Sequence, residues 1–292
     1  MRDHLKTIFE ARAWRPHAIA EAAAARRRRA SLLGDDGKLF IIAADHPARG
    51  ALRAGDRPMA LADRAQLLER LSLALRRPGV DGVLGTADVI EDLLLLGALD
   101  DKVVVGSMNR GGLAGTVFEI DDRFTGYDAA AIAGMGFDAG KMLFRIDPDD
   151  PATAATMQSC ARAVSDLAAR GLMAMVEPFI SHRVDGRVRN DLSPEAVTRS
   201  ITVASGLGTT SAYTWLKVPV VDDMERVLAA STLPALLLGG EVSADQDAVF
   251  TQWHKALQIP SVRGLVAGRT LLFPADDDVA GAVDAAVGLL RR

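Results

Sequence analysis

The chain has 292 residues, is 49% hydrophobic and 25% charged, and carries a formal net charge of −4. This balance is ordinary for a soluble globular protein and gives no reason to expect a nucleic-acid or membrane partner. No apolar run reaches the roughly 18 residues that a membrane helix needs, and a single cysteine, Cys160, excludes an internal disulfide framework. We therefore expect a cytoplasmic protein that binds a small molecule.

From residue 38 onward, short apolar runs alternate with longer stretches of helical spacing. The runs predict eight strands, at 38–45, 82–86, 102–107, 140–146, 172–179, 213–220, 234–240 and 264–269. The intervening stretches predict helices at 59–77, 87–99, 127–136, 151–171, 193–206, 222–231, 243–258 and 277–292. The strands are apolar on both faces, as in a parallel sheet covered by helices, and eight such units indicate an α/β protein with a (β/α)8 TIM barrel.

The chain divides into an N-terminal helical extension, residues 1–37, and the barrel, residues 38–292. We expect an extra helix at 17–30 that lies across one end of the barrel. A doubly wound open sheet is the alternative fold, but no G-x-G-x-x-G sequence follows the first strand.

Lysine is scarce in this chain, with six lysines against 28 arginines. Arginine stays protonated in proteins, whereas a buried lysine can lose its proton. Lys217, inside the apolar run "YTWLKVPV", and Lys141, in "GKMLFRI", therefore stand out. A neutral buried amine forms a Schiff base with a carbonyl substrate, and a second cation nearby favours the neutral form. A strand lysine that reaches solvent or pairs with an acid is the alternative interpretation.

Further polar residues fall at the carboxyl ends of the predicted strands, where barrel enzymes place their active sites. Asp45 and His46 end the first strand, and Glu177 lies on the fifth. The two acids are expected to move protons or to orient the lysines, although simple ion pairing also fits. His46 is expected to hydrogen-bond the substrate or to support Asp45, because no two of the five histidines have metal-ligand spacing.

Glycines end the seventh and eighth strands, in "LLLGG" and "VAGRTLLFP". Such ends leave backbone N–H groups open, and barrels often bind a phosphate there. The candidate phosphate ligands are Gly239, Gly240, Gly268 and Arg269. Glycine at a tight turn is the alternative explanation for each motif.

Six motifs occur together and in order: "AADHPARG", "GKMLFRIDPDD", "MVEPF", "WLKVPV", "LLLGG" and "VAGRTLLF". In this combination, residues 38–275 resemble the DeoC/LacD superfamily of class I aldolases. Within it, the tagatose-1,6-bisphosphate and archaeal-type fructose-bisphosphate aldolases have the closest patterns. The resemblance implies a homo-oligomeric lyase that needs neither metal nor cofactor. It assigns the Schiff base to Lys217, the second lysine to Lys141, the acids to Glu177 and Asp45, and the phosphate site to Gly239, Gly240, Gly268 and Arg269.

Two departures from the family pattern bear on the substrate. Glu241 follows the Gly-Gly pair, and its negative charge is unfavourable beside a phosphate. Phe144 and Arg145 replace tyrosines of the tagatose-type enzymes, so Arg145 is expected to receive a carboxylate or a second anionic group.

The chain also resembles an actinobacterial subgroup associated with myo-inositol breakdown. That resemblance implies cleavage of 2-deoxy-5-keto-gluconate 6-phosphate to dihydroxyacetone phosphate and malonate semialdehyde. Two other functions stay open: coenzyme A-dependent acyl transfer on the same scaffold, and a non-catalytic barrel subunit.

Overall fold

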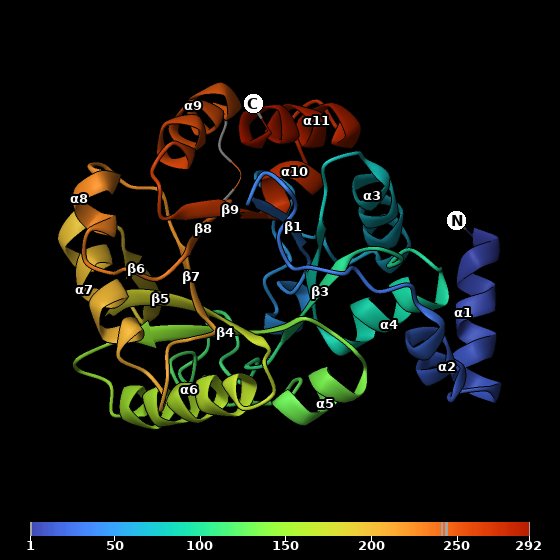
Figure 1. The fold of residues 1–292 in the computed structure, drawn as a ribbon, viewed down its shortest axis with the longest axis horizontal. Helices are drawn as coiled ribbons and strands as arrows, with labels where there is room; N and C mark the ends of the chain where they lie inside the picture. The colour runs from blue at the N-terminus through green and yellow to red at the C-terminus, as the bar shows by residue number, and fades with distance from the viewer. Residues whose placement is uncertain (1, 241, 243–244, 292) are drawn as a thin grey trace.

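The computed structural model describes residues 2–240, 242 and 245–291. Within these residues, eight parallel strands form a closed barrel in the order β4-β3-β2-β1-β9-β8-β7-β5, closed by the pairing of β4 with β5 (Figure 1). The barrel strands are β1 (Leu39–Ala43), β2 (Gly82–Gly85), β3 (Val103–Ser107), β4 (Ala139–Ile146), β5 (Met173–Val184), β7 (Thr214–Val218), β8 (Ala235–Leu238) and β9 (Val262–Ala267). The predicted (β/α)8 barrel is confirmed, and the open doubly wound sheet is excluded.

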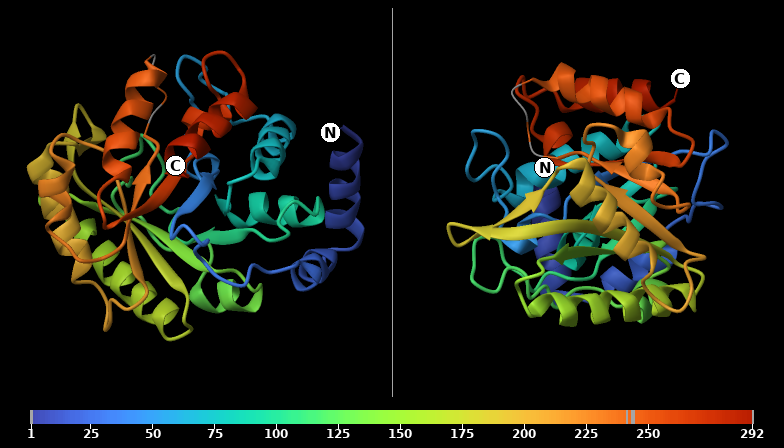
Figure 2. Two further views of the ribbon diagram at one scale, coloured as in Figure 1. Left: turned by 45° about the horizontal axis from the view of Figure 1, so that its top comes forward. Right: turned by 90° about the vertical axis from the view of Figure 1, so that its left-hand side faces the viewer.

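Helices surround the strands on the outside of the barrel (Figures 1 and 2). Those that follow the barrel strands are α3 (Arg64–Arg76), α4 (Ala87–Leu95), α5 (Ala129–Gly134), α6 (Ala152–Ala168), α7 (Pro194–Ser205), α8 (Met224–Leu228), α9 (Gln246–Leu257), α10 (Arg269–Leu272) and α11 (Val279–Leu290). A 3-10 turn, η1 (Pro47–Arg49), follows β1. None of the helices in the described ranges is long and apolar enough to cross a lipid bilayer.

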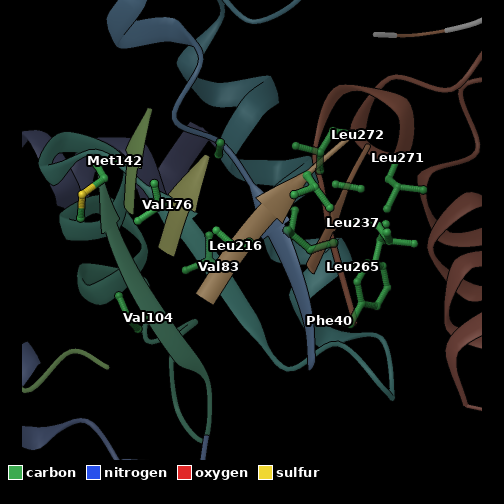
Figure 3. Packing of buried hydrophobic residues seen from close by; sticks show 14 of the residues in the cluster. Phe40, Val83, Val104, Met142, Val176, Leu216, Leu237, Leu265, Leu271 and Leu272 are labelled. Atoms are coloured by element: carbon green, nitrogen blue, oxygen red, sulfur yellow. The ribbon is translucent and has the colours of Figure 1, made fainter. Parts of the chain in front are cut away.

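Each barrel strand buries both of its faces because successive side chains point in opposite directions. On β1 and β4, the outward-facing Phe40 and Met142 belong to the layer between strands and helices (Figure 3). Ile41 and Met175 belong to a separate cluster inside the barrel. The double burial explains why the strand sequences are apolar without strict alternation.

The N-terminal segment forms two helices, α1 (Arg2–Trp14) and α2 (Ala18–Ala25), and both lie beside α4 (Figure 1). The predicted extra helix at 17–30 is therefore confirmed as α2, but it ends earlier than predicted and lies beside α4, so its predicted position across the barrel end is wrong. Arg26 ends α2, because its guanidinium donates to the backbone carbonyls of Lys102 and Gly136 at 2.8 and 2.7 Å. Beyond the helices, Leu32 and Leu33 pack against the cluster inside the barrel, so an irregular segment covers this end of the barrel instead.

Strand β5 continues past its predicted end at 179 and forms an antiparallel hairpin with β6 (Arg187–Asp191). Asp185 and Gly186 make the turn with φ angles of 50° and 73°, as two-residue hairpin loops require. The hairpin, yellow in the right-hand view of Figure 2, projects beyond the barrel strands.

Candidate active site

Four ionisable side chains meet in one layer inside the barrel, at the carboxyl ends of its strands. Asp45 lies two residues beyond Ala43, an interior residue of β1, and Glu177 lies two beyond Met175 on β5. Lys141 and Lys217 hold the equivalent inward positions two residues after Ala139 on β4 and Trp215 on β7. The side chains lie above the hydrophobic interior cluster because inward positions recur every second residue. Lys217 is 4% exposed and Lys141 is 2% exposed.

Glu177 bridges the two lysines. Its Oε2 lies 2.5 Å from the Nζ of Lys141, and its Oε1 accepts a hydrogen bond from the Nζ of Lys217. One carboxylate therefore places the two amines side by side. The inward orientation predicted for Lys217, with Lys141 and an acid beside it, is what the structure contains.

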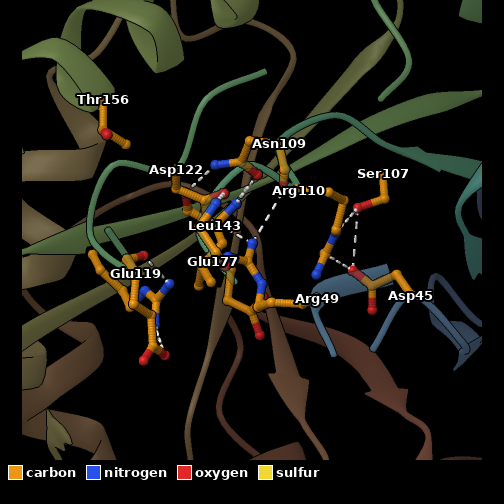
Figure 4. A network of polar contacts seen from close by, with 12 residues as sticks. Asp45, Arg49, Ser107, Asn109, Arg110, Glu119, Asp122, Leu143, Thr156 and Glu177 are labelled. Atoms are coloured by element: carbon orange, nitrogen blue, oxygen red, sulfur yellow. Dashed lines mark hydrogen bonds and ion pairs between the residues drawn. The ribbon is translucent and has the colours of Figure 1, made fainter. Parts of the chain in front are cut away.

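Asp45 anchors the other side of Lys141. Its Oδ2 accepts hydrogen bonds from Lys141 Nζ at 3.2 Å and from Ser107 Oγ at 3.3 Å, and it is ion-paired with Arg110. The Nε of Arg110 donates to Ser107 Oγ at 2.8 Å, so Arg110 is held between Ser107 and Asp45 (Figure 4). The local arrangement fixes the position of Asp45 and, through it, of Lys141.

The electrostatics of the layer favour ionised acids. Burial alone would raise the pKa of Asp45, but Arg110 and Lys141 outweigh burial and hold that pKa well below its ordinary value of 3.8. Burial is likewise outweighed at Glu177, where Lys141 and Lys217 lower the pKa to about 2. Burial lowers the pKa of Lys141, against the opposing charges of Asp45 and Glu177. Arg110 adds a third cation beside the two lysines and two carboxylates of the layer, so these five side chains carry one net positive charge when all are ionised.

His46 lies at the edge of this layer, with its Nδ1 3.8 Å from Asp45 Oδ1. Within the part of the chain that the structure describes, this nitrogen is buried and has no hydrogen-bond partner. Burial lowers the pKa of His46 to about 3, with further lowering by Arg269 and Lys217, which outweigh the opposing charge of Asp45. The imidazole is therefore neutral at pH 7, and 25% of the side chain is exposed.

Arg145 already has a protein partner. Its guanidinium pairs with Glu119 Oε1 at 2.6 Å and donates to the Glu119 carbonyl at 2.6 Å. Nearby, buried Arg49 pairs with Asp122 at 2.6 Å and donates to the carbonyl of Asn109 (Figure 4). These contacts fasten the loop between β3 and α5 over the barrel.

The glycines predicted to bind phosphate have structural reasons to be glycine. A Cβ at Gly268 would lie 2.2 Å from the Ala43 carbonyl oxygen, and Gly240 has a φ of 70°. Gly239 follows β8, and a Cβ there would lie 2.8 Å from that of Ala267. Arg269 begins the four-residue helix α10, and Glu241 lies outside the described residues. The phosphate site stays a prediction.

A cavity of about 690 Å³ opens at this end of the barrel. It is bounded by the segment at 50–59, the loop before α5, the β5–β6 hairpin and Arg269. None of the described lining residues is one of the four ionisable side chains of the inner layer. Glu119 and Arg269 do line it, and Arg269 lies close enough to His46 to affect its pKa. Arg145, the partner of Glu119, lies two inward positions beyond Lys141 on β4, so the cavity lies above the buried layer.

Sequence reasoning missed Ser107, Arg110 and Glu119. Ser107 had a signal, because it follows Val103 and Val105 at inward spacing on β3. Arg110 and Glu119 lie in an irregular loop, where spacing does not reveal direction.

Fold and site together define a (β/α)8 barrel with two buried lysines that share a carboxylate. The family model described as Cgl0159-like matches residues 37–287, and the chain belongs to this family. The crystal structure of Cgl0159 from Corynebacterium glutamicum (Brevibacterium flavum) is 54% identical, with a TM-score of 0.97 and coverage of 99% of this chain and 97% of that one.

Two archaeal structures share the fold at lower identity. An archaeal fructose 1,6-bisphosphate aldolase is 19% identical, with a TM-score of 0.66 and coverage of 93% of this chain and 98% of that one. A second, whose catalytic lysine is covalently bound to the carbinolamine intermediate of its substrate, is 20% identical, with a TM-score of 0.65 and coverage of 93% and 99%. No curated protein matches the chain.

Proposed function

We propose that this chain is a class I aldolase that cleaves a phosphorylated ketose or keto acid through an imine on Lys217. The observation that carries the proposal is the pair of buried amines, Lys141 and Lys217, joined by Glu177. A purely structural lysine needs one acid, whereas two ammonium groups that share one carboxylate repel each other. A similar fold with a lysine-bound carbinolamine occurs in the archaeal aldolase described above.

The chemistry needs one of the two amines to be neutral. Loss of a proton from the lysine pair relieves the repulsion between the two ammonium groups and leaves the inner layer and Arg110 together without net charge. Glu177 contacts both Nζ atoms, so it can pass a proton from Lys217 to Lys141. Lys217 is then the nucleophile and Lys141 is the protonated partner.

The reaction proceeds by addition of the Lys217 amine to the ketone carbon, which gives a carbinolamine. Loss of water leaves a protonated imine. When the β-hydroxyl gives its proton to Glu177, the bond between the α and β carbons breaks and its electron pair moves into the imine, releasing the aldehyde. The resulting enamine takes up a proton at the α carbon, and hydrolysis of the imine releases dihydroxyacetone phosphate and restores the amine.

The remaining polar residues have supporting roles in this proposal. Asp45, held by Arg110 and Ser107, positions the Lys141 ammonium beside Glu177. His46, neutral at pH 7 and partly exposed, hydrogen-bonds a substrate hydroxyl through its ring. Gly239, Gly240, Gly268 and Arg269 hold the phosphate next to the ketone. Arg145 instead holds Glu119, so it acts on the loop rather than on the substrate.

Release of dihydroxyacetone phosphate tests the activity. The assay compares fructose 1,6-bisphosphate, fructose 1-phosphate and 2-deoxy-5-keto-gluconate 6-phosphate. We expect at least one of them to be cleaved without coenzyme A, and Lys217→Arg to abolish turnover. Lys255→Arg, which changes an exposed lysine of α9, is the matched control. Full activity of Lys217→Arg, or a requirement for coenzyme A, refutes the proposal.

A further inference from the structure

The cavity above the inner layer has a strongly cationic wall. Among the described residues that line it, four are arginines and one is an acid. The acid, Glu119, is already paired with Arg145 at 2.6 Å. Glu119 therefore does not neutralise Arg53, Arg187 and Arg189, and this part of the described lining favours an anionic ligand.

Two of these arginines come from the β5–β6 hairpin, which is not part of the barrel. Arg187 and Arg189 are two residues apart on β6, so their side chains leave the same face of the hairpin. Both are exposed, and neither side chain has a hydrogen bond or ion pair with any described residue. Arg183, one strand over, instead bonds the Val117 carbonyl and Asp150.

The cavity joins this hairpin to the end of the site where a phosphate is expected. Arg53, on the loop after η1, contributes a third guanidinium and donates only weakly, at 3.4 Å, to the carbonyl of Gly55 in its own loop. Arg269 lines the cavity as well and lies near His46 and the inner layer. A ligand that reaches from Arg269 to the hairpin therefore meets cationic groups at both ends.

We propose that the β5–β6 hairpin binds a second anionic group of the substrate, at the end distant from the ketone, through Arg187 and Arg189. The inference rests on the proposed aldolase function and adds that the enzyme selects substrates that are anionic at both ends. Guanidinium groups bind carboxylate and phosphate alike through paired N–H donors, so the distal group is an oxyanion of either kind.

Three ligands test the proposal because they share a phosphate next to the ketone and end in different groups, although the deoxy keto acid also lacks one hydroxyl beside its terminal group. Fructose 1-phosphate has a distal hydroxyl, fructose 1,6-bisphosphate a distal phosphate, and 2-deoxy-5-keto-gluconate 6-phosphate a distal carboxylate. Calorimetric titration measures the affinity of each for the wild type and for the Arg187→Gln/Arg189→Gln variant. The control, Arg162→Gln/Arg199→Gln, removes two exposed arginines from α6 and α7 and causes the same change in net charge.

We expect the wild type to bind at least one ligand with a distal anion about tenfold or more tightly than fructose 1-phosphate, as charge-assisted hydrogen bonds predict. The hairpin variant should lose this advantage and bind fructose 1-phosphate unchanged, while the control variant keeps the preference. Whichever of the phosphate and carboxylate ligands loses more affinity identifies the distal group. Equal wild-type affinity for all three ligands, no binding of any of them at millimolar concentration, or an equal loss for all three in the hairpin variant overturns the proposal.

Borohydride trapping of dihydroxyacetone phosphate separates this inference from the function on which it rests. Dihydroxyacetone phosphate has no distal end, so the hairpin variant should trap it as the wild type does. If the wild type forms no adduct, the aldolase function is refuted. If the wild type forms the adduct but shows no preference for a distal anion, only the hairpin site is refuted.

Discussion

Replacement of Glu177 by glutamine tests the central ion-pair arrangement. The amide keeps the shape of the side chain but removes the charge that the two buried lysines share. Lys141 and Lys217 lower the pKa of Glu177 from its ordinary 4.5 to about 2, which corresponds to about 3 kcal/mol of stability at neutral pH. A loss of similar size is expected independently, because removing one partner of a buried ion pair costs about 3–5 kcal/mol of folding free energy.

The pH dependence has a definite sign. Because the folded-state pKa of Glu177 is depressed, its contribution is complete above pH 4.5 and is lost as the pH falls towards 2. Urea unfolding should therefore show Glu177→Gln to be about 3 kcal/mol less stable than the wild type at pH 7, with the difference largely gone near pH 2.

A control variant and a double variant sharpen this test. Glu225→Gln removes one charge from an exposed position on α8 and should change stability by less than about 0.5 kcal/mol. Adding Lys141→Met to Glu177→Gln removes one of the two cations that Glu177 contacts, so the double variant should lose less than the sum of the single losses. Stability of Glu177→Gln within about 0.5 kcal/mol of the wild type at pH 7, or additive losses, would refute the reasoning.

Three further outcomes follow from the structure. Burial lowers the pKa of His46 to about 3, so between pH 6.5 and 3 the imidazole takes up a proton in the unfolded chain but not in the folded one. The free energy of unfolding of the wild type should therefore fall by about 1–2 kcal/mol between pH 7 and pH 5 through this group, and His46→Gln should not show that fall. Urea unfolding at the two pH values measures the difference. Lys141→Met should reduce kcat about 10²–10⁴-fold in the aldolase assay, the range for loss of a proton-transfer group, while imine trapping on Lys217 persists; loss of trapping as well would contradict the assigned roles. Arg49→Met should destabilise the fold by about 3–5 kcal/mol in urea, because it leaves buried Asp122 unpaired, and Arg49→Met/Asp122→Leu should lose less than Arg49→Met does.

The barrel was predictable because its strands are buried on both faces and appear as short apolar runs. Alternation along the same strand placed Lys217 on one face with Trp215, and Trp215 packs against the interior cluster. The barrel prediction also brought Lys141 and Glu177 to one layer, because parallel strands end at the same face of a barrel.

What escaped prediction depends on contacts between irregular segments. Arg145 was expected to receive a substrate anion, but the loop before α5 brings Glu119 into contact with it. No sequence pattern near either residue predicts this contact. The β5–β6 hairpin is polar and exposed, so it lacks the apolar signal of a core strand, although Asp185-Gly186 was a turn signal in the sequence. The helix at 17–30 was predicted too long because the contacts of Arg26 that end it involve residues far along the chain.

Reductive trapping tests the central claim most directly. The protein is incubated with dihydroxyacetone phosphate and borohydride, digested, and mapped by mass spectrometry. The account predicts a reduced adduct on the peptide that contains Lys217 and none in Lys217→Arg. No adduct in the wild type, or an adduct confined to another lysine, would contradict it.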